Sequence, residues 1–197
     1  MAGDLTKNFS LSEFAQRDPY RPVPAKYHAN VQRLAEQLQP LRDVVGRIVI
    51  TSSYRTEAKN AEVKGAPTSR HLTAKAADFT VPGMSNKKVY CTILTLIAQG
   101  KMEQGGLGWY GEKTANRTKH LHYDVRSRKA RWNKSGGALP VCPPVTEEED
   151  MAALDDYKKA QAAQRKVAGW FLIAAGYAVA GGKLPKWLRD KLKYVLA

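Results

Sequence analysis

Three of the four histidines of the chain lie in two short segments, residues 69–78 and 120–122. The first segment contains His71 and Asp78, and the second contains His120 and His122. If residues 76–81 and 120–125 are β-strands, side chains two positions apart lie on the same side of the sheet, so these polar groups can converge. Two imidazoles, a carboxylate and an open fourth position form the ligand set of a catalytic zinc site. The sequence therefore predicts one zinc ion bound between the two segments.

The two histidines of the second segment can have separate roles. Alternation places His120 and His122 on one polar face of a strand, with apolar residues behind them. One imidazole can bind the metal while the other exchanges protons with a substrate or with the attacking water. The alternative is that these residues bind no metal. In that case His71 is a surface loop residue, Asp78 is an acid in a turn, and the other two histidines are exposed on a strand. The coincidence of both segments favours the metal site.

The hydrophobic pattern predicts the elements that must position these residues. They are a capped short helix over 8–15, a non-helical proline-rich connector over 18–24, an amphipathic helix over 31–45, a strand over 47–51, a helix over 86–99 and a glycine-rich strand over 105–110. Pro40 lies inside the amphipathic helix and is expected to kink it or divide it in two. Residues 52–56 form an exposed-looking turn that carries Arg55.

The net charge and the cysteine content limit the classes of function that the protein can have. A formal net charge of +14 favours anionic partners such as nucleic acid, acidic membranes and bacterial wall polymers. Nucleic acid is the weakest of these, because no zinc knuckle, helix-turn-helix or glycine-rich phosphate loop is found. Cys91 and Cys142 cannot form a disulfide framework, and Cys91 is expected to be a small apolar residue inside a helix. The amino terminus does not resemble a signal peptide, so we expect synthesis in a cytoplasm and another exit route.

The composition changes after Trp132. We expect a first domain over 1–132, a linker rich in Gly and Pro over 133–146, and a C-terminal helical segment over 147–197. The last segment contains an apolar stretch of about sixteen residues, just short of the roughly 18–20 that span a bilayer, and then a basic amphipathic helix. It could dock on the first domain as a helical hairpin, contact an anionic membrane or wall polymer, or pack into a larger assembly.

The motif Ser69-x-His71-x-x-x-x-Ala76-x-Asp78, followed by His120-x-His122, resembles the LAS zinc peptidases. That superfamily includes lysostaphin-type peptidases, D-Ala-D-Ala carboxypeptidases and the hedgehog signalling domain. The branch it resembles best is that of the phage and bacterial D-Ala-D-Ala carboxypeptidase-type peptidases, which cut peptidoglycan stem peptides. The similarity extends from about residue 8 to residue 132, and further similar segments are residues 9–14, 38–42, 50–55 and 122–126.

The resemblance implies an α+β fold in which a small, mainly antiparallel sheet with flanking helices holds one zinc ion, with the C-terminal helices as an appendage. It also implies that His71, Asp78 and His122 are the zinc ligands. His120 would be the catalytic histidine, and Arg55 would meet the substrate carbonyl or terminal carboxylate.

Two positions depart from the family pattern. Lys119 stands where several members carry an acidic general base, so the base is either His120 or an acid such as Glu112 or Asp124. Ala74 replaces a glycine of the family, which is a mild change unless the position needs a positive φ. Asp124 itself is either a strand-end acid or a partner that orients an imidazole.

We therefore expect a zinc-dependent peptidoglycan peptidase that cleaves stem peptides at or near D-Ala, as a carboxypeptidase or an endopeptidase. A phage lysis protein or a virion-associated wall-degrading protein, acting at the periplasm and cell wall, is expected from the size and from an amino terminus that does not resemble a signal peptide. The alternative is a non-catalytic, zinc-stabilised binding module for the cell wall or a protein partner, which Lys119 favours. A third possibility is a basic nucleic-acid or membrane-binding protein in which the histidines are incidental.

Overall fold

The computed structural model describes residues 3–112 and 119–143. The chain divides into two units, Met1–Pro144 and Val145–Ala197. The second unit, with the helices predicted over 147–197, lies outside the described residues. Within the described part of the chain, no helix is both long enough and apolar enough to cross a membrane.

Short elements precede the first long helix. The predicted N-terminal helix is the 3-10 helix η1 (Leu11–Phe14), and the Ser10 N–H before it donates to the Glu13 carboxylate at 2.8 Å. The proline-rich connector is not helical, as predicted from its prolines. It contains β2 (Tyr20–Arg21), which forms a two-stranded hairpin with β1 (Gln16–Arg17) just before the connector. A further 3-10 helix, η2 (Ala25–Tyr27), begins directly after the connector.

The amphipathic helix is α1 (His28–Val45), and Gly46, with φ of 76°, follows its last residue. Pro40 lies inside this single helix, so the prediction that it could divide the helix in two is wrong. A buried stripe continues on both sides of the proline, and packing of both halves on one core outweighs the local cost of about 3 kcal/mol. The stripe consists of Val31, Leu34, Ala35, Leu38 and Leu41.

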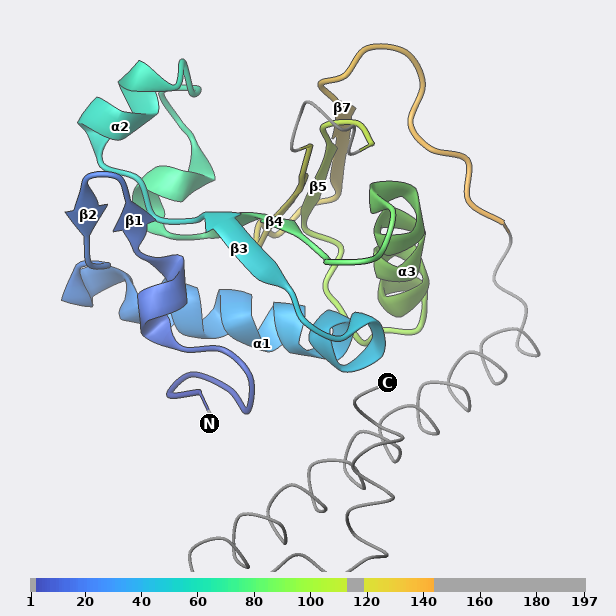
Figure 1. Ribbon diagram of the computed structural model, residues 1–197, viewed down its shortest axis with the longest axis horizontal. Coiled ribbons are helices and arrows are strands. Elements are labelled where there is room, and N and C mark those ends of the chain that lie inside the picture. Colours follow the sequence, from blue (N-terminus) through green and yellow to red (C-terminus); the bar gives the residue numbers. More distant parts are fainter. Residues whose placement is uncertain (1–2, 113–118, 144–197) are drawn as a thin grey trace, which may run out of the picture. The chain divides into compact units, whose positions relative to one another are not determined.

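Five strands form the main sheet, in the order β3-β4-β6-β5-β7. Each neighbouring pair is antiparallel except β5 and β7, which are parallel (Figure 1). The strands are β3 (Val49–Ser52), β4 (Ala76–Thr80), β5 (Gly106–Trp109), β6 (Leu121–Asp124) and β7 (Ala130–Asn133). This mixed architecture with a small, mainly antiparallel sheet confirms the predicted α+β class.

The register of β4 and β6 separates the core from the polar face. Asp78 pairs with His122 across the two strands, and Ala77 pairs with Tyr123. The residues between the polar ones, Phe79 and Leu121 among them, are buried in the same core as α1 and α3 (Asn86–Ala98). The polar face therefore lies on the side of the sheet away from these helices.

Helix α3 begins after Ser85, whose hydroxyl accepts from the Lys88 N–H at 3.2 Å and so caps the helix. Cys91 of this helix is bonded to Cys142, 51 residues later in the chain. Cys91 lies inside a helix as expected, but it is half of a disulfide rather than only a small apolar residue, because the segment after β7 returns to α3. With Asn133 still part of β7, the described structure continues past residue 132, where a linker was expected to begin.

Candidate metal centre

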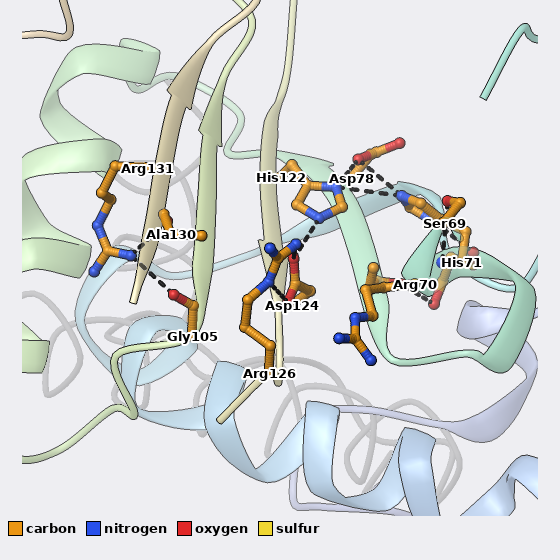
Figure 2. Close-up of polar contacts among 12 residues, drawn as sticks. Ser69, Arg70, His71, Asp78, Gly105, His122, Asp124, Arg126, Ala130 and Arg131 are labelled. Atoms are coloured by element: carbon orange, nitrogen blue, oxygen red, sulfur yellow. Dashed lines mark hydrogen bonds and ion pairs between the residues drawn. The ribbon is translucent and has the colours of Figure 1, made fainter. Parts of the chain in front are cut away.

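Three polar side chains converge on the face of the sheet away from the helices (Figure 2). Asp78 is on β4, His122 is on β6, and His71 is on the 3-10 helix η3 (Arg70–Thr73) that precedes β4. All three residues are buried, with 3–6% of their surfaces exposed. Their ligand atoms all lie within 4.8 Å of one another.

The spacing of these atoms suits a tetrahedral ion. The Asp78 Oδ1 atom lies 3.3 Å from His71 Nε2 and 2.8 Å from His122 Nδ1, and the two nitrogens are 3.2 Å apart. Bonds of about 2.0–2.1 Å in a tetrahedral zinc site place neighbouring ligand atoms roughly 3.3 Å apart. A common centre about 2 Å from all three atoms therefore exists.

The other ring nitrogen of each histidine fixes its tautomer. His71 Nδ1 lies 2.6 Å from the Ser53 carbonyl oxygen, and His122 Nε2 lies 3.1 Å from Asp124 Oδ2. Neither oxygen can donate, so both of these nitrogens carry the proton. The two nitrogens that face Asp78 then present lone pairs, and three acceptors point at one place. A divalent cation resolves this arrangement, and the residues present fit zinc.

Local structure positions His71. The Ser69 hydroxyl accepts from the His71 N–H at 3.4 Å, and the His71 carbonyl accepts from the Arg55 N–H at 3.1 Å. After the 3-10 turn, Ala74 adopts the left-handed conformation with φ of 53°. The family glycine at this position therefore has a conformational reason, and Ala74 carries the cost of about 1–2 kcal/mol of that conformation.

Asp124 is the partner that orients His122. Its carboxylate is fully buried and also accepts from Arg126 Nε and Nη2, both at 2.7 Å. Burial alone would raise the pKa of Asp124, but the hydrogen bonds from His122 and Arg126 lower it to about 2. Of the two readings of Asp124, the structure supports the orienting partner.

Glycines of β5 make room for this arrangement. Gly108 pairs with His122 on one side and with Trp132 on the other. Because Gly108 has no side chain, the Trp132 ring reaches across β5, with its centroid 5.1 Å from that of His122. A Cβ at Gly108 would lie 2.5 Å from the indole, and one at Gly106 would collide with the Asp124 carboxylate. The glycines of this strand thus leave room for neighbouring side chains.

Arg55 forms an ion pair with Asp78. Its Nη2 contacts Asp78 Oδ2 and its Nε donates to the Ser52 hydroxyl at 2.8 Å. Asp78 Oδ1 is thus the oxygen that faces the histidines. Arg55 is 16% exposed at its side chain, so the expected exposed turn is partly buried. Ser53 in the same turn is almost fully buried.

His120 lies at the edge of the cluster. Its Nε2 is 3.9 Å from Asp78 Oδ1, and its ring stacks on Tyr110 with centroids 4.2 Å apart. Its side chain is 28% exposed, which is more than that of either His71 or His122. His120 is therefore placed beside the predicted ligands, where an approaching molecule can reach it.

The other candidate bases have different contacts. The Glu112 carboxylate accepts from the backbone N–H groups of Asn86 and Lys87, at the start of α3. Asp124 is used by His122 and Arg126, as described above. Neither acid faces the open side of the cluster, so His120 is the best placed of the three proton acceptors considered from the sequence.

Burial and charge shift the pKa values of the cluster. Burial lowers the pKa of His71 and of His120, while Asp78 opposes this in both. Burial would raise the pKa of Asp78, but the nearby His71 and His122 rings lower it well below its usual range. Burial would lower the pKa of His122, but the neighbouring Asp124 and Asp78 carboxylates raise it. Asp78 is therefore an anion at neutral pH.

The cluster opens into a groove of about 1200 Å³. Its lining includes all five residues predicted for the site: His71, Asp78, His120, His122 and Arg55. It also includes Tyr110 and Trp132, which sequence reasoning did not assign to the site. Only the pairing of β6, β5 and β7 brings these aromatic rings to the histidines, and no local pattern in the sequence reveals that pairing.

Comparison with known proteins identifies the family. A family model described as peptidase M15 matches residues 7–123, which include every residue of the cluster. No curated protein matches the chain significantly. The matched region covers more than half of the chain and ends at Tyr123, one residue after the last predicted ligand. The chain therefore belongs to the peptidase M15 family, a family of zinc-dependent metallopeptidases.

Proposed function

We propose that the protein is a zinc-dependent peptidase that cleaves peptidoglycan stem peptides at or near D-alanine. Its membership of the peptidase M15 family supports a metallopeptidase acting on peptidoglycan. The observation that carries the proposal is the convergence of three acceptor atoms, from His71, Asp78 and His122, at mutual distances of 2.8–3.3 Å. These three residues would hold one zinc ion.

Each residue of the cluster has a role in this proposal. Zinc, when bound, is a Lewis acid that can lower the pKa of water from 15.7 to about 7 and polarise a carbonyl. His120 takes a proton from the attacking water and returns it to the leaving amine. Arg55 holds Asp78 through Nη2, and its Nη1 can donate to the substrate carbonyl or carboxylate as negative charge develops.

The variant His120→Ala tests this assignment. Loss of a general acid–base group lowers the rate by about 10²–10⁴-fold, while zinc remains bound because its ligands are intact. The assay is digestion of purified peptidoglycan by the zinc-loaded full chain, with new peptide ends measured by mass spectrometry. His28→Ala is the matched control, because His28 lies outside the groove and contacts the Val23 carbonyl at 3.0 Å. Inactivity of the folded, zinc-loaded wild-type protein would refute the proposal.

The second candidate is a non-catalytic, zinc-stabilised module that binds the cell wall or a protein partner. Lys119, at a position where several relatives carry an acid, favours it. In this case His120→Ala would keep its affinity for peptidoglycan, measured by co-sedimentation, and the wild type would release no peptide ends.

The biological setting is also a proposal. Similarity to phage and bacterial wall peptidases and the net charge of +14 support a lysis or virion-associated protein that acts at the periplasm and the cell wall. Directing the full chain to the periplasm of a bacterium should then lyse the cells. The His120→Ala variant, directed in the same way, should not.

A further inference from the structure

The groove crosses the whole sheet. Its lining includes Thr51 and Ser52 on β3, at one edge, and Trp132 and Asn133 on β7, at the other. The metal ligands on β4 and β6 lie between these edges, because the strand order is β3-β4-β6-β5-β7. Figure 1 shows α2 (Glu57–Glu62) and the β1–β2 hairpin beyond β3, with β7 on the opposite side. A substrate bound at the metal therefore has groove on both sides of it.

Both ends of the groove carry positive charge. Lysine and arginine supply eight lining side chains, whereas aspartate supplies two, Asp18 and the metal ligand Asp78. We call the cations beyond β3 the β3 bank; they are Arg17, Lys59 and Lys64. We call the cations beside β7 the β7 bank; they are Arg128 and Lys134.

Several of these cations are available to a ligand. Lys64, Arg128 and Lys134 are exposed. Within residues 3–112 and 119–143, no ion pair joins these three side chains to an acid. By contrast, Lys59 is paired with Glu62 at 2.7 Å, and Arg17 donates to the Ile50 carbonyl at 2.6 Å. Each bank thus has at least one lysine or arginine that can meet a carboxylate of the substrate.

We propose that the enzyme is an endopeptidase for anionic peptides that carry carboxylates on both sides of the bond it cuts. This inference rests on the proposed function and goes further by naming the position of the bond. Hydrolysis adds water across an internal amide bond, so that a new carboxylate and a new amine form in the middle of the peptide. A carboxypeptidase needs a groove that closes after one residue, whereas the groove lined by the described residues runs past the metal ligands to β3 on one side and to β7 on the other.

The products of peptidoglycan digestion test the inference. The zinc-loaded full chain is incubated with purified peptidoglycan, and all released species are identified by mass spectrometry. Internal cuts, with several residues on both sides, support the endopeptidase. Release of single terminal residues overturns it but leaves the proposed peptidase function intact. No release of either kind overturns both.

Charge reversal then tests the two banks. Lys64→Glu in the β3 bank and Lys134→Glu in the β7 bank should each raise KM by about three- to fivefold, as exposed charge pairs do, with kcat unchanged. The effect should shrink in 0.5 M salt. Lys88→Glu and Lys129→Glu are matched controls, because these exposed lysines lie outside the groove, and their KM should stay within twofold of wild type. A change in KM at one bank alone, or at neither, contradicts recognition on both sides of the bond.

Discussion

Replacing Asp124 by asparagine tests whether metal binding depends on the buried partner of His122. The carboxylate of Asp124 is fully buried, and its Oδ2 accepts from His122 Nε2 at 3.1 Å. This contact keeps the proton on Nε2, so that Nδ1 presents its lone pair beside Asp78. An asparagine amide can present N–H groups to the same ring nitrogen, and the proton then moves to Nδ1, where it blocks the metal.

The substitution should lower both the affinity for zinc and the free energy of unfolding. Loss of a carboxylate that orients a metal-binding histidine lowers metal affinity by about 10- to 100-fold. The pKa of Asp124 is lowered to about 2 from an ordinary value of 3.8. Its ionised form therefore stabilises the fold above pH 3.8, and this contribution is lost as the pH falls through about 2. At pH 7 the variant forgoes that contribution, which is about 2 kcal/mol.

The assay is a competition titration with a fluorescent zinc chelator at pH 7, together with urea unfolding of the metal-free protein. Asp43→Asn is the matched control, because Asp43 forms an exposed ion pair with Lys7 at 2.9 Å, away from the groove. The control should bind zinc as the wild type does. If Asp124→Asn also bound zinc within twofold of the wild type, His122 would not depend on this carboxylate, and the reasoning would be refuted.

Three further changes give separate outcomes. Gly108→Ala places a Cβ 2.5 Å from the Trp132 indole, which lies beside His122, so the indole must move. Zinc affinity should then fall in the same competition titration. Unchanged affinity would show that the indole does not support the site. Cys91→Ser opens the bond to Cys142, which closes a loop of 51 residues, and should lower the free energy of unfolding in urea by up to about 4 kcal/mol relative to the oxidised wild type. The reduced wild type should match the variant, and a variant as stable as the oxidised wild type would contradict this prediction. Because the pKa of His122 is raised above 6.5, a proton competes with zinc below that raised value, so apparent zinc affinity should already fall as the pH drops towards 6.5; an affinity that is flat between pH 8 and 6 would contradict this.

The alternation of polar and apolar residues was enough to predict the central part of the site. Asp78 and His122 each stand between buried apolar neighbours, which fixed the strand assignment and the face of each side chain. The ranges of the two long helices also followed from local pattern, and the structure ends α1 at Gly46 and begins α3 after Ser85, residue types that favour those positions. The candidate ligands therefore followed from local pattern, and the family resemblance chose among the histidines.

The features that the sequence did not predict depend on contacts between distant segments. The disulfide requires the chain after β7 to return to α3, and no local signal marks that return. Trp132 reaches His122 only because β7 pairs with β5 in parallel, with Gly108 between them. Pro40 suggested a kinked or divided helix, and the helix is not divided because the shared core on both sides of it outweighed the local preference.

The direct pairing of Asp78 with His122 has a consequence for how the protein tolerates insertions and deletions. Because side chains alternate along each strand, a shift of β6 by a single position would present Leu121 or Tyr123 to the metal in place of the imidazole. A one-residue insertion in either strand would thus replace the metal-binding imidazole with a Leu or Tyr side chain, while the backbone hydrogen bonds between the strands could still form. The sheet can therefore pair its backbone without forming the site, and a form with β6 shifted by one position would be inert.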